Sequence, residues 1–445
     1  RKKMAGTMWT CSALLMMLAV ISKGGHPIGF QPEQMHLSFT GNPRSIMVTW
    51  VTTNKTDSII EYSRFGSKLF GLKAIGSSTI FTDGGVEKRF MYIHRVLIKE
   101  LDPGAQYVYH CGSTDGWSDM FFFSAMREGS DWSPQLAVFG DMGNENPQSL
   151  ARLQKETQMG MYDAILHVGD FAYDMDEDNA RIGDEFMRQI ESIAAYVPYM
   201  TCPGNHENAY NFSNYRNRFS MPGNTEGLWY SWNIGPAHII SISTEVYYYT
   251  DYGLDLLLKQ YEWLKKDLEE ANLPENKKQT PWIITIGHRP MYCSNNDTDD
   301  CKSFNSRVRT GFNSSSGVMP GLEKLFFIYD EGVDIEFWAH EHSYERLWPI
   351  YDYKVLNGSR EFPYVNPKGP VHIITGSAGC RERVDPFVPH ARDWSAFRSS
   401  DYGYTRLKIQ NGSHVYLEQV SDDQSGKVID SMWLIKENHG VAAWV

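Results

Sequence analysis

The chain has 445 residues, a formal net charge of −12 and an aromatic content of 13%. This length favours two domains with sizeable cores, and the aromatic content is typical of a globular, β-rich protein rather than a disordered one. An acidic surface repels polyanions at long range, so nucleic acid is not an expected partner. A phosphate-bearing substrate would therefore depend on local positive charge, such as that of a metal ion.

The N-terminus has the pattern of a secretory signal. A basic start at residues 1–3 precedes an apolar stretch at about residues 13–21, and small residues follow up to Gly25. We interpret residues 1–25 as a signal peptide, because the apolar run is too short to cross a bilayer of about 30 Å. We see no second long apolar run, so we expect a secreted protein without a membrane span.

Residues 27–125 are predicted to form an all-β domain. Residues 45–51 and 107–111 alternate apolar and polar side chains, as half-buried strands do, and a turn sequence at residues 101–104 separates them. Short strands between turns over about a hundred residues indicate a β-sandwich of the fibronectin type III kind. We assign this domain a structural role because no run of metal-ligand side chains occurs in it.

From residue 134 to residue 436 the pattern changes to an α/β domain. Its apolar strands are nearly continuous, which is typical of sheets covered on both faces by helices. The predicted strands are residues 136–139, 164–168, 199–202, 238–242, 282–286, 335–338 and 372–375. One helix is predicted to begin at Asn146 as its cap, with Pro147 in the first turn, and to end near Gln158; another fills residues 254–270. We find no internal repeat.

Five short segments each follow one of these apolar runs and end in side chains that bind metals. They are Gly140–Gly143, Gly169–Tyr173, Gly204–Glu207, Gly287–Pro290 and Ala339–His342. Loops at the carboxyl ends of strands form the usual binding crevice of an α/β domain, so we expect the five segments to converge. The donors mix carboxylate, amide, phenolate and imidazole, which suits two adjacent metal ions better than one.

The first candidate ligands are two aspartates and a tyrosine. Asp141 and Asp170 each follow a glycine, which lets the backbone bend so that the carboxylate turns into the crevice. Tyr173 comes three residues after Asp170. A tyrosine phenolate is a hard oxygen donor that implies a strongly Lewis-acidic ion such as ferric iron.

The remaining candidates are an asparagine and the histidines. Asn205 offers a neutral carbonyl oxygen, whereas the adjacent His206 points elsewhere and is available for proton transfer. His340 and His342 alternate by two, so on an extended segment they share a face and can reach two neighbouring ions.

The combination of these motifs resembles the purple acid phosphatases, within the calcineurin-like metallophosphoesterase superfamily. The resemblance covers nearly the whole mature chain, including the N-terminal domain of the larger, plant-type members. Within the family, the chain most resembles the animal iron/zinc purple acid phosphatase-like group. It implies a ferric ion bound by Asp141, Asp170, Tyr173 and His342. It also implies a divalent ion, zinc or else iron or manganese, bound by Asp170, Asn205, His288 and His340.

The resemblance further implies a mechanism. Asp170 would bridge the two ions, a metal-bound hydroxide would attack the phosphorus, and His206 would bind the phosphate and protonate the leaving group. The implied activity is that of a secreted acid phosphatase acting on small phosphate monoesters. Plant-type members usually carry further histidines after the ligand that corresponds to His288, but no histidine lies between His288 and His340 here.

Two alternatives therefore stay open. The same scaffold could act on phosphodiesters or pyrophosphate, because the missing histidines bear on substrate preference. The chain could also be a non-catalytic secreted binding glycoprotein, although the complete ligand set argues against this. The oligomeric state does not follow from the sequence.

Cysteines and sequons agree with an oxidising compartment. Cys293 and Cys301 bracket a polar loop and are the expected disulfide. Because this loop begins after His288, we expect loss of the disulfide to change substrate affinity more than metal content. Three further cysteines remain in the mature chain: Cys111, Cys202 and Cys380. They cannot all pair within one chain, so at least one is free or forms an intermolecular disulfide. Six sequons are expected to carry glycans, at Asn54, Asn211, Asn296, Asn313, Asn357 and Asn411.

Overall fold

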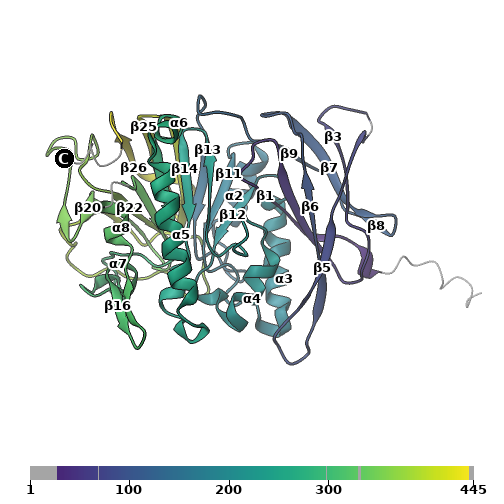
Figure 1. Ribbon diagram of the computed structural model, residues 1–445, viewed down its shortest axis with the longest axis horizontal. Helices are drawn as coiled ribbons and strands as arrows, with labels where there is room; N and C mark the ends of the chain where they lie inside the picture. Colours follow the sequence, from purple (N-terminus) through teal and green to yellow (C-terminus); the bar gives the residue numbers. More distant parts are fainter. Residues whose placement is uncertain (1–27, 69, 297, 329–331, 440–445) are drawn as a thin grey trace, which may run out of the picture.

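The computed structural model describes residues 28–68, 70–296, 298–328 and 332–439. A β-domain drawn in purple and blue occupies one end of the molecule, and a larger α/β domain drawn in teal to yellow occupies the other (Figure 1). The predicted signal peptide, residues 1–25, lies outside the described residues. None of the described helices is long and apolar enough to cross a membrane.

The N-terminal domain is a sandwich of two antiparallel sheets, in the orders β1-β2-β6-β5 and β4-β3-β7-β8, with β9 paired to β7. Its core is apolar and aromatic, with Trp50 and Tyr109 fully buried between the sheets. The all-β prediction is thus confirmed. The strands are β1 Glu33–Phe39, β2 Ile46–Thr52, β3 Ile59–Arg64, β4 Leu72–Ile75, β5 Ser77–Thr82, β6 Phe90–Ile98, β7 Gln106–Ser113, β8 Gly116–Trp117 and β9 Phe121–Ser124.

The second domain contains two mixed sheets packed face to face. The first has the order β12-β11-β10-β24-β25-β26, and the second has the order β13-β14-β15-β18-β22-β19-β23. The first sheet is built from β10 Gln135–Phe139, β11 Ala164–Val168, β12 Tyr199–Cys202, β24 Gly403–Asn411, β25 His414–Ser421 and β26 Lys427–Ile435. The second is built from β13 Tyr230–Ile234, β14 Ala237–Ser241, β15 Trp282–Ile286, β18 Ile335–Trp338, β19 Tyr344–Leu347, β22 Val371–Thr375 and β23 Ser395–Ser399.

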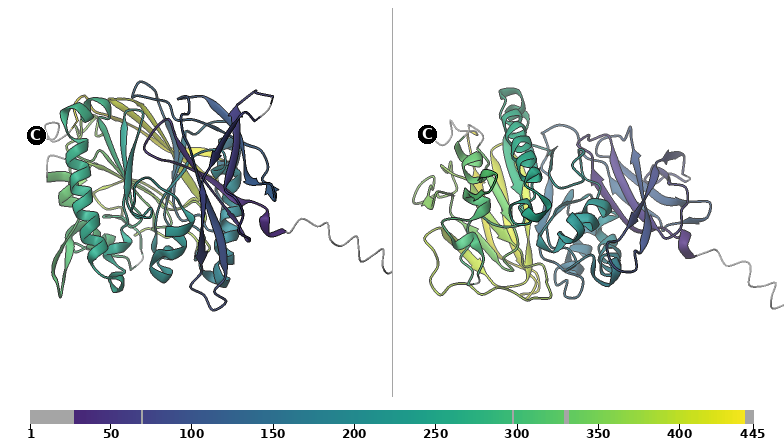
Figure 2. Two further views of the ribbon diagram at one scale, coloured as in Figure 1. Left: turned by 45° about the vertical axis from the view of Figure 1, so that its right-hand side comes forward. Right: turned by 60° about the horizontal axis from the view of Figure 1, so that its bottom comes forward.

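Helices cover the outer face of each sheet. Leu153, Phe186 and Tyr215 come from α2, α3 and α4 and pack against the first sheet, and Leu264 of α5 and Phe326 of α8 pack against the second. The long α5 runs along one side of the domain in both views of Figure 2. The helices are α2 Leu150–Gln158, α3 Glu177–Ala194, α4 Ala209–Arg218, α5 Asp255–Ala271, α6 Pro274–Gln279, α7 Arg307–Thr310 and α8 Glu323–Ile328. This layered arrangement confirms the predicted α/β fold.

The start of α2 differs from the prediction. The helix begins at Leu150, and its cap position is Ser149 rather than Asn146. The Asn146 side chain instead donates a hydrogen bond to the Cys380 carbonyl oxygen (2.9 Å), and Pro147 lies in the turn before the helix. A tertiary contact thus uses the side chain that the local pattern assigned to capping.

The two domains meet along α3 and α4. The buried guanidinium of Arg218 pairs with Asp184 (2.8 Å), whose other oxygen contacts Arg89 of the N-terminal domain. The Tyr109 hydroxyl donates to the Ala195 carbonyl just after α3 (2.7 Å). Buried polar groups with partners on both sides fix the relative position of the domains.

Candidate metal centre

The candidate ligands lie at one edge of the two packed sheets. β10, β11 and β12 run parallel in the first sheet, and β15 and β18 run parallel in the second, so their carboxyl ends share an edge within each sheet. The Gly140 amide donates to the Thr375 carbonyl at the end of β22 (2.9 Å), which joins the two edges. Asp141 follows β10, Asp170 and Tyr173 follow β11, Asn205 and His206 follow β12, His288 follows β15, and His340 and His342 follow β18.

Two glycines make room for this convergence. A Cβ atom on Gly204 would lie 2.2 Å from Asp170 Oδ1, and one on Gly169 would lie 2.5 Å from His288 Nδ1. Gly169 also has a φ of +84°, a conformation that side chains disfavour. The Gly-Asp and Gly-Asn pairs are therefore needed for close approach and are more than ordinary turns.

Asp141, Tyr173 and His342 form what we call the Tyr173 half of the site. The Tyr173 hydroxyl oxygen lies 2.9 Å from His342 Nε2 and 3.3 Å from Asp141 Oδ1. His342 Nε2 lies 3.5 Å from the same aspartate oxygen. Burial, together with the charge of Asp141, raises the pKa of Tyr173 well above its usual value. A multivalent cation would oppose this effect and stabilise the phenolate.

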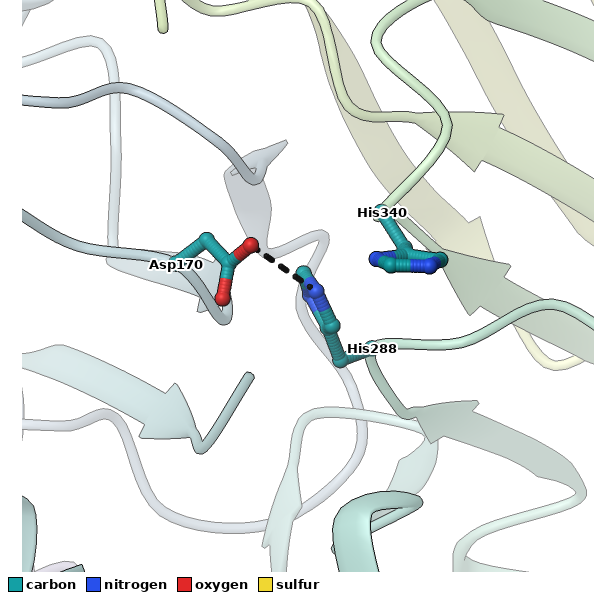
Figure 3. A group of neighbouring side chains, drawn as sticks. All are labelled: Asp170, His288 and His340. Atoms are coloured by element: carbon teal, nitrogen blue, oxygen red, sulfur yellow. Dashed lines mark ion pairs between the residues drawn. The ribbon is translucent and has the colours of Figure 1, made fainter. Parts of the chain in front are cut away.

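Asn205, His288 and His340 form the His288 half. His288 Nε2 lies 3.2 Å from Asp170 Oδ2 and 3.1 Å from Asn205 Oδ1. One donor atom from each of Asp170, His288 and His340 can be chosen so that all lie within 4.8 Å of one another. Figure 3 shows the two imidazoles and the carboxylate turned toward a shared space, with the Asp170–His288 contact dashed.

Asp170 connects the two halves. Burial would raise the pKa of its carboxyl group, but the neighbouring charges of His288 and His206 hold that pKa well below the usual range. Its own amide and those of Phe171 and Gly204 all donate to the Glu207 carboxylate (2.8–3.0 Å). Glu207 thereby ties the loop after β11 to the loop after β12, and fixes Asp170 between them.

His206 lies at the open side of the site. Its Nδ1 is 2.7 Å from Asp174 Oδ1, and its Nε2 is 3.8 Å from Asp170 Oδ2. Burial lowers the pKa of His206, but the charge of Asp170 and the hydrogen bond to Asp174 outweigh it and raise the pKa to about 9. The imidazole is thus held by one nitrogen, while the other faces the centre.

The donor set fits metal cations. Asp141 is buried beside the Tyr173 phenol and the His342 imidazole, and Asp170 is buried beside the His288 imidazole. Each carboxylate also accepts a hydrogen bond from one backbone amide. Burial lowers the pKa of His288, but Asp170 raises it to about 10, so without an ion the carboxylate is balanced by a proton on the histidine. Buried charge requires a partner, and a cation bound here would take the place of that proton.

One expectation about the histidines needs correction. His340 and His342 do not lie on an extended segment, because His340 has a φ of +68°. The His340 amide donates to Asp141 Oδ2 (3.0 Å), which holds this bend. The two rings still enter the same site, but each belongs to a different half.

Several supporting residues were missed by the sequence reasoning. Asp174, Glu207 and Asp385 hold His206, Asp170 and His342 respectively, the last through its amide (2.7 Å). Their position beside ligands in the sequence was a signal only for Asp174 and Glu207. Asp299 and Asp385 are distant in sequence from the candidate ligands that they contact. For Asp299 the sequence offered one signal, which is the acidic character of the loop after His288.

The cysteines occupy separate environments. Cys293 and Cys301 are joined by a disulfide bond, which closes the loop after His288. Cys111, Cys202 and Cys380 are free and buried. Among the sequon asparagines, four are exposed, namely Asn54, Asn296, Asn313 and Asn411, whereas Asn211 and Asn357 are half-buried.

Comparison with known proteins places this geometry in a family. The model for calcineurin-like phosphoesterases matches residues 134–344, the purple acid phosphatase N-terminal domain matches residues 32–125, and the C-terminal region of iron/zinc purple acid phosphatase-like proteins matches residues 369–431. The chain is similar to acid phosphatase type 7 of Danio rerio, at 69% identity over 94% of each chain, and to that of Homo sapiens, at 57% identity over 97% of each.

More distant relatives agree. The chain is 30% identical to the Fe(3+)-Zn(2+) purple acid phosphatase 12 of Arabidopsis thaliana, over 91% of this chain and 84% of that one. It superimposes on the purple acid phosphatase PPD1 from yellow lupin seeds with a TM-score of 0.73 at 25% identity, over 91% of this chain and 74% of that one. This chain therefore belongs to the purple acid phosphatase family, within the calcineurin-like metallophosphoesterases.

Proposed function

We propose that the chain is a secreted acid phosphatase that hydrolyses small phosphate monoesters at a dinuclear centre of ferric iron and a divalent ion. The observation that carries the proposal is the convergence of seven donor side chains from five loops into two halves that share Asp170. The similarity to acid phosphatases over nearly the whole chain supports the same activity. A non-catalytic binding protein has no need of this complete arrangement.

The residues divide into two sets of ligands. Asp141, Tyr173 and His342 would hold the ferric ion with Asp170, because a phenolate and carboxylates suit a hard trivalent cation. The second set, Asn205, His288 and His340 with Asp170, would hold zinc, or else divalent iron or manganese. When bound, such ions supply Lewis acidity and a hydroxide nucleophile at low pH.

The protein's own side chains orient the His206 imidazole and let it transfer a proton. Asp174 holds Nδ1 of His206, so that Nε2 is the nitrogen left to face a phosphate oxygen or a leaving group. Arg381 in turn contacts Asp174 (3.3 Å), which fixes the carboxylate. His206 is thus placed to hydrogen-bond the phosphate and to protonate the leaving alkoxide.

A second substrate class has one observation in its favour. Asp299, whose side chain is 40% exposed, lies beside His340 on a loop that contains no histidine. A carboxylate at this position disfavours highly charged substrates such as polyphosphates and favours esters of lower charge. A phosphodiesterase activity is therefore the alternative that the assay must separate.

The test is turnover by purified protein with aryl phosphate, bis-aryl phosphate and pyrophosphate at acid pH, together with metal analysis and a visible absorption spectrum. The proposal expects the monoester to give the highest kcat/KM, with one iron and one divalent ion in each chain. A higher kcat/KM for the diester would select the alternative. Metal-free protein without hydrolase activity would select the binding protein.

Secretion and glycosylation belong to the same proposal. The disulfide Cys293–Cys301 and the exposed sequons are those of a chain made in an oxidising compartment. Expression of the full-length chain in cultured animal cells should deliver it to the medium, with a decrease in mass after treatment with a glycosidase. Retention in the cytosol with unchanged mass would contradict this part of the proposal.

A further inference from the structure

The disulfide-closed loop carries a carboxylate to one of the metal ligands. Asp299 lies two residues before Cys301, and its Oδ2 is 2.8 Å from Nε2 of His340. The same nitrogen lies 2.8 Å from Nη1 of Arg289. Nε2 of His340 is thus engaged on the side of the loop and is not available to an ion.

These two contacts require different tautomers of His340. With its proton on Nε2, the ring donates to Asp299 and keeps a lone pair on Nδ1. With its proton on Nδ1, the ring accepts from Arg289 and has no lone pair for an ion. Only the contact with Asp299 therefore prepares His340 as a ligand, and Figure 3 shows a ring nitrogen directed toward Asp170 and His288.

Arg289 is held by a different partner. Its Nε lies 3.1 Å from both carboxylate oxygens of the buried Glu245, and its guanidinium stacks on the Tyr248 ring at 4.4 Å. It is therefore fixed beside Asp299 and His340 without depending on either. When His340 carries its proton on Nε2, the positive charge of Arg289 favours the ionised form of the Asp299 carboxylate.

The loop is anchored on both sides of its contact with His340. The Tyr248 hydroxyl donates to Asp300 (2.8 Å), and Asp300 also accepts from the Arg307 amide (3.0 Å). On the other side, Sγ of Cys301 lies 3.0 Å from a carboxylate oxygen of Glu341, the residue between the two histidine ligands. The disulfide therefore packs directly against the segment that carries His340.

We propose that Asp299 is a positioning residue for the divalent ion: it holds His340 in the tautomer and orientation that present Nδ1 to the site. The inference rests on the dinuclear centre proposed above. Carboxylates that hold metal-binding histidines typically contribute 10–100-fold to metal affinity. The sequence shows only that the loop is acidic, whereas the structure singles out one aspartate of it.

The test compares Asp299→Asn with Asp300→Asn in the full-length, iron-containing protein. Both changes remove one negative charge from the same loop, but Asp300 contacts Tyr248 and Arg307 rather than His340. The dissociation constant of Zn²⁺ is measured by equilibrium dialysis, and the tyrosinate absorption band is recorded in parallel. Asp299→Asn should weaken Zn²⁺ by about 10–100-fold and leave the band unchanged.

Further readouts separate positioning from a general loss of structure. Asp299→Glu should recover part of the Zn²⁺ affinity, and saturating Zn²⁺ should restore most of the kcat of Asp299→Asn. Zn²⁺ affinity of Asp299→Asn within twofold of the wild type, or an equal loss in Asp300→Asn, would overturn the inference. If the wild-type protein binds no second ion, the proposed centre itself is wrong, and this result is visible before any variant is made.

Discussion

The Tyr173 half and the His288 half of the site differ in what holds their ligands. In the Tyr173 half, Asp141 and Tyr173 are almost completely buried at strand ends, and His342 contacts the Arg383 carbonyl and the Asp385 carboxylate through ring and amide. In the His288 half, the outer ligand His340 is held by Asp299, which lies on a disulfide-closed loop. The side chain of Asp299 is 40% exposed.

The difference indicates which ion each half retains. Ligands that are themselves buried at strand ends, such as Asp141 and Tyr173, need little reorganisation when an ion binds, whereas a ligand oriented by a surface loop shares the mobility of that loop. We therefore expect the iron of the Tyr173 half to be held tightly and the divalent ion of the His288 half to exchange more easily. Single-residue variants should separate the properties of the two halves.

Asp170→Ala should abolish the distinction by removing the residue common to both halves. Both ions should be lost or bound more weakly, and activity should fall by more than it does in His206→Ala, because Asp170 is the residue that both halves share. Metal content and kcat are the measurements. A variant that keeps both ions and near-normal turnover would falsify the assignment of Asp170 as the bridge.

His206→Ala should leave both halves intact and lower kcat by roughly 10²–10⁴-fold, as expected for the loss of a general acid. Its Nδ1 is held by Asp174, and its Nε2 lies 3.8 Å from Asp170 Oδ2, where it can reach a bound phosphate. Metal content and the absorption spectrum should match those of the wild type. Loss of an ion in this variant would show that His206 is a ligand and that the two halves are wrongly divided.

Tyr173→Phe should act on one half alone. Removing the phenolate should abolish the charge-transfer colour while preserving the fold, because the ring packs against His206 and His342 in the buried site. We expect a smaller loss of activity than in His206→Ala, with the Zn²⁺ affinity of the His288 half unchanged. A colourless wild-type enzyme that is active without iron would contradict the assignment.

Cys293→Ser combined with Cys301→Ser should act on the other half. On the sequence alone we expected a larger effect on substrate affinity than on metal content, but the Asp299–His340 contact gives a reason to expect the reverse. Zn²⁺ affinity should fall on the order of 10-fold, with the colour retained. Cys111→Ser, at a buried thiol of the N-terminal domain, is the control. An increase in KM with unchanged Zn²⁺ affinity would restore the original expectation.

Acid unfolding of the N-terminal domain must be separated from acid effects on either half. Burial lowers the pKa of His94 to about 4, and its ring nitrogens lie 2.8 and 2.7 Å from the Thr52 and Ser58 hydroxyls. Between about pH 6.5 and 4 the unfolded chain takes up a proton there that the folded chain does not, so the free energy of unfolding falls as the pH falls.

His94→Gln keeps the hydrogen-bonding capacity but cannot titrate. Between about pH 6.5 and 4, its free energy of unfolding should fall by less than that of the wild type, with a difference on the order of 1–3 kcal/mol. Urea denaturation at each pH measures this difference. Metal content should not change. An unaltered pH dependence would show that His94 takes up its proton equally well in the folded and unfolded chains, and therefore does not contribute to acid unfolding.

The fold class, and the set of side chains that converge at the candidate site, could be predicted from local sequence patterns. Strand periodicity is a local property, and strands such as Ala164–Val168 and Trp282–Ile286 were predicted at the bounds that the structure gives them. The ligand loops follow directly from these strands, because parallel strands place their carboxyl ends at the same edge. The motifs after those strands therefore predicted which side chains would lie together.

The groups that orient these side chains could be identified only from contacts between distant segments. Asp299 reaches His340 and Asp385 reaches His342 across about forty residues of chain, and no local pattern encodes such a contact. The same holds for the left-handed conformation of His340 and for Asn146, whose side chain bonds to Cys380 rather than capping α2. Ligand type is a property of single residues and their spacing, whereas ligand orientation depends on hydrogen bonds between segments that meet only when the two sheets pack together.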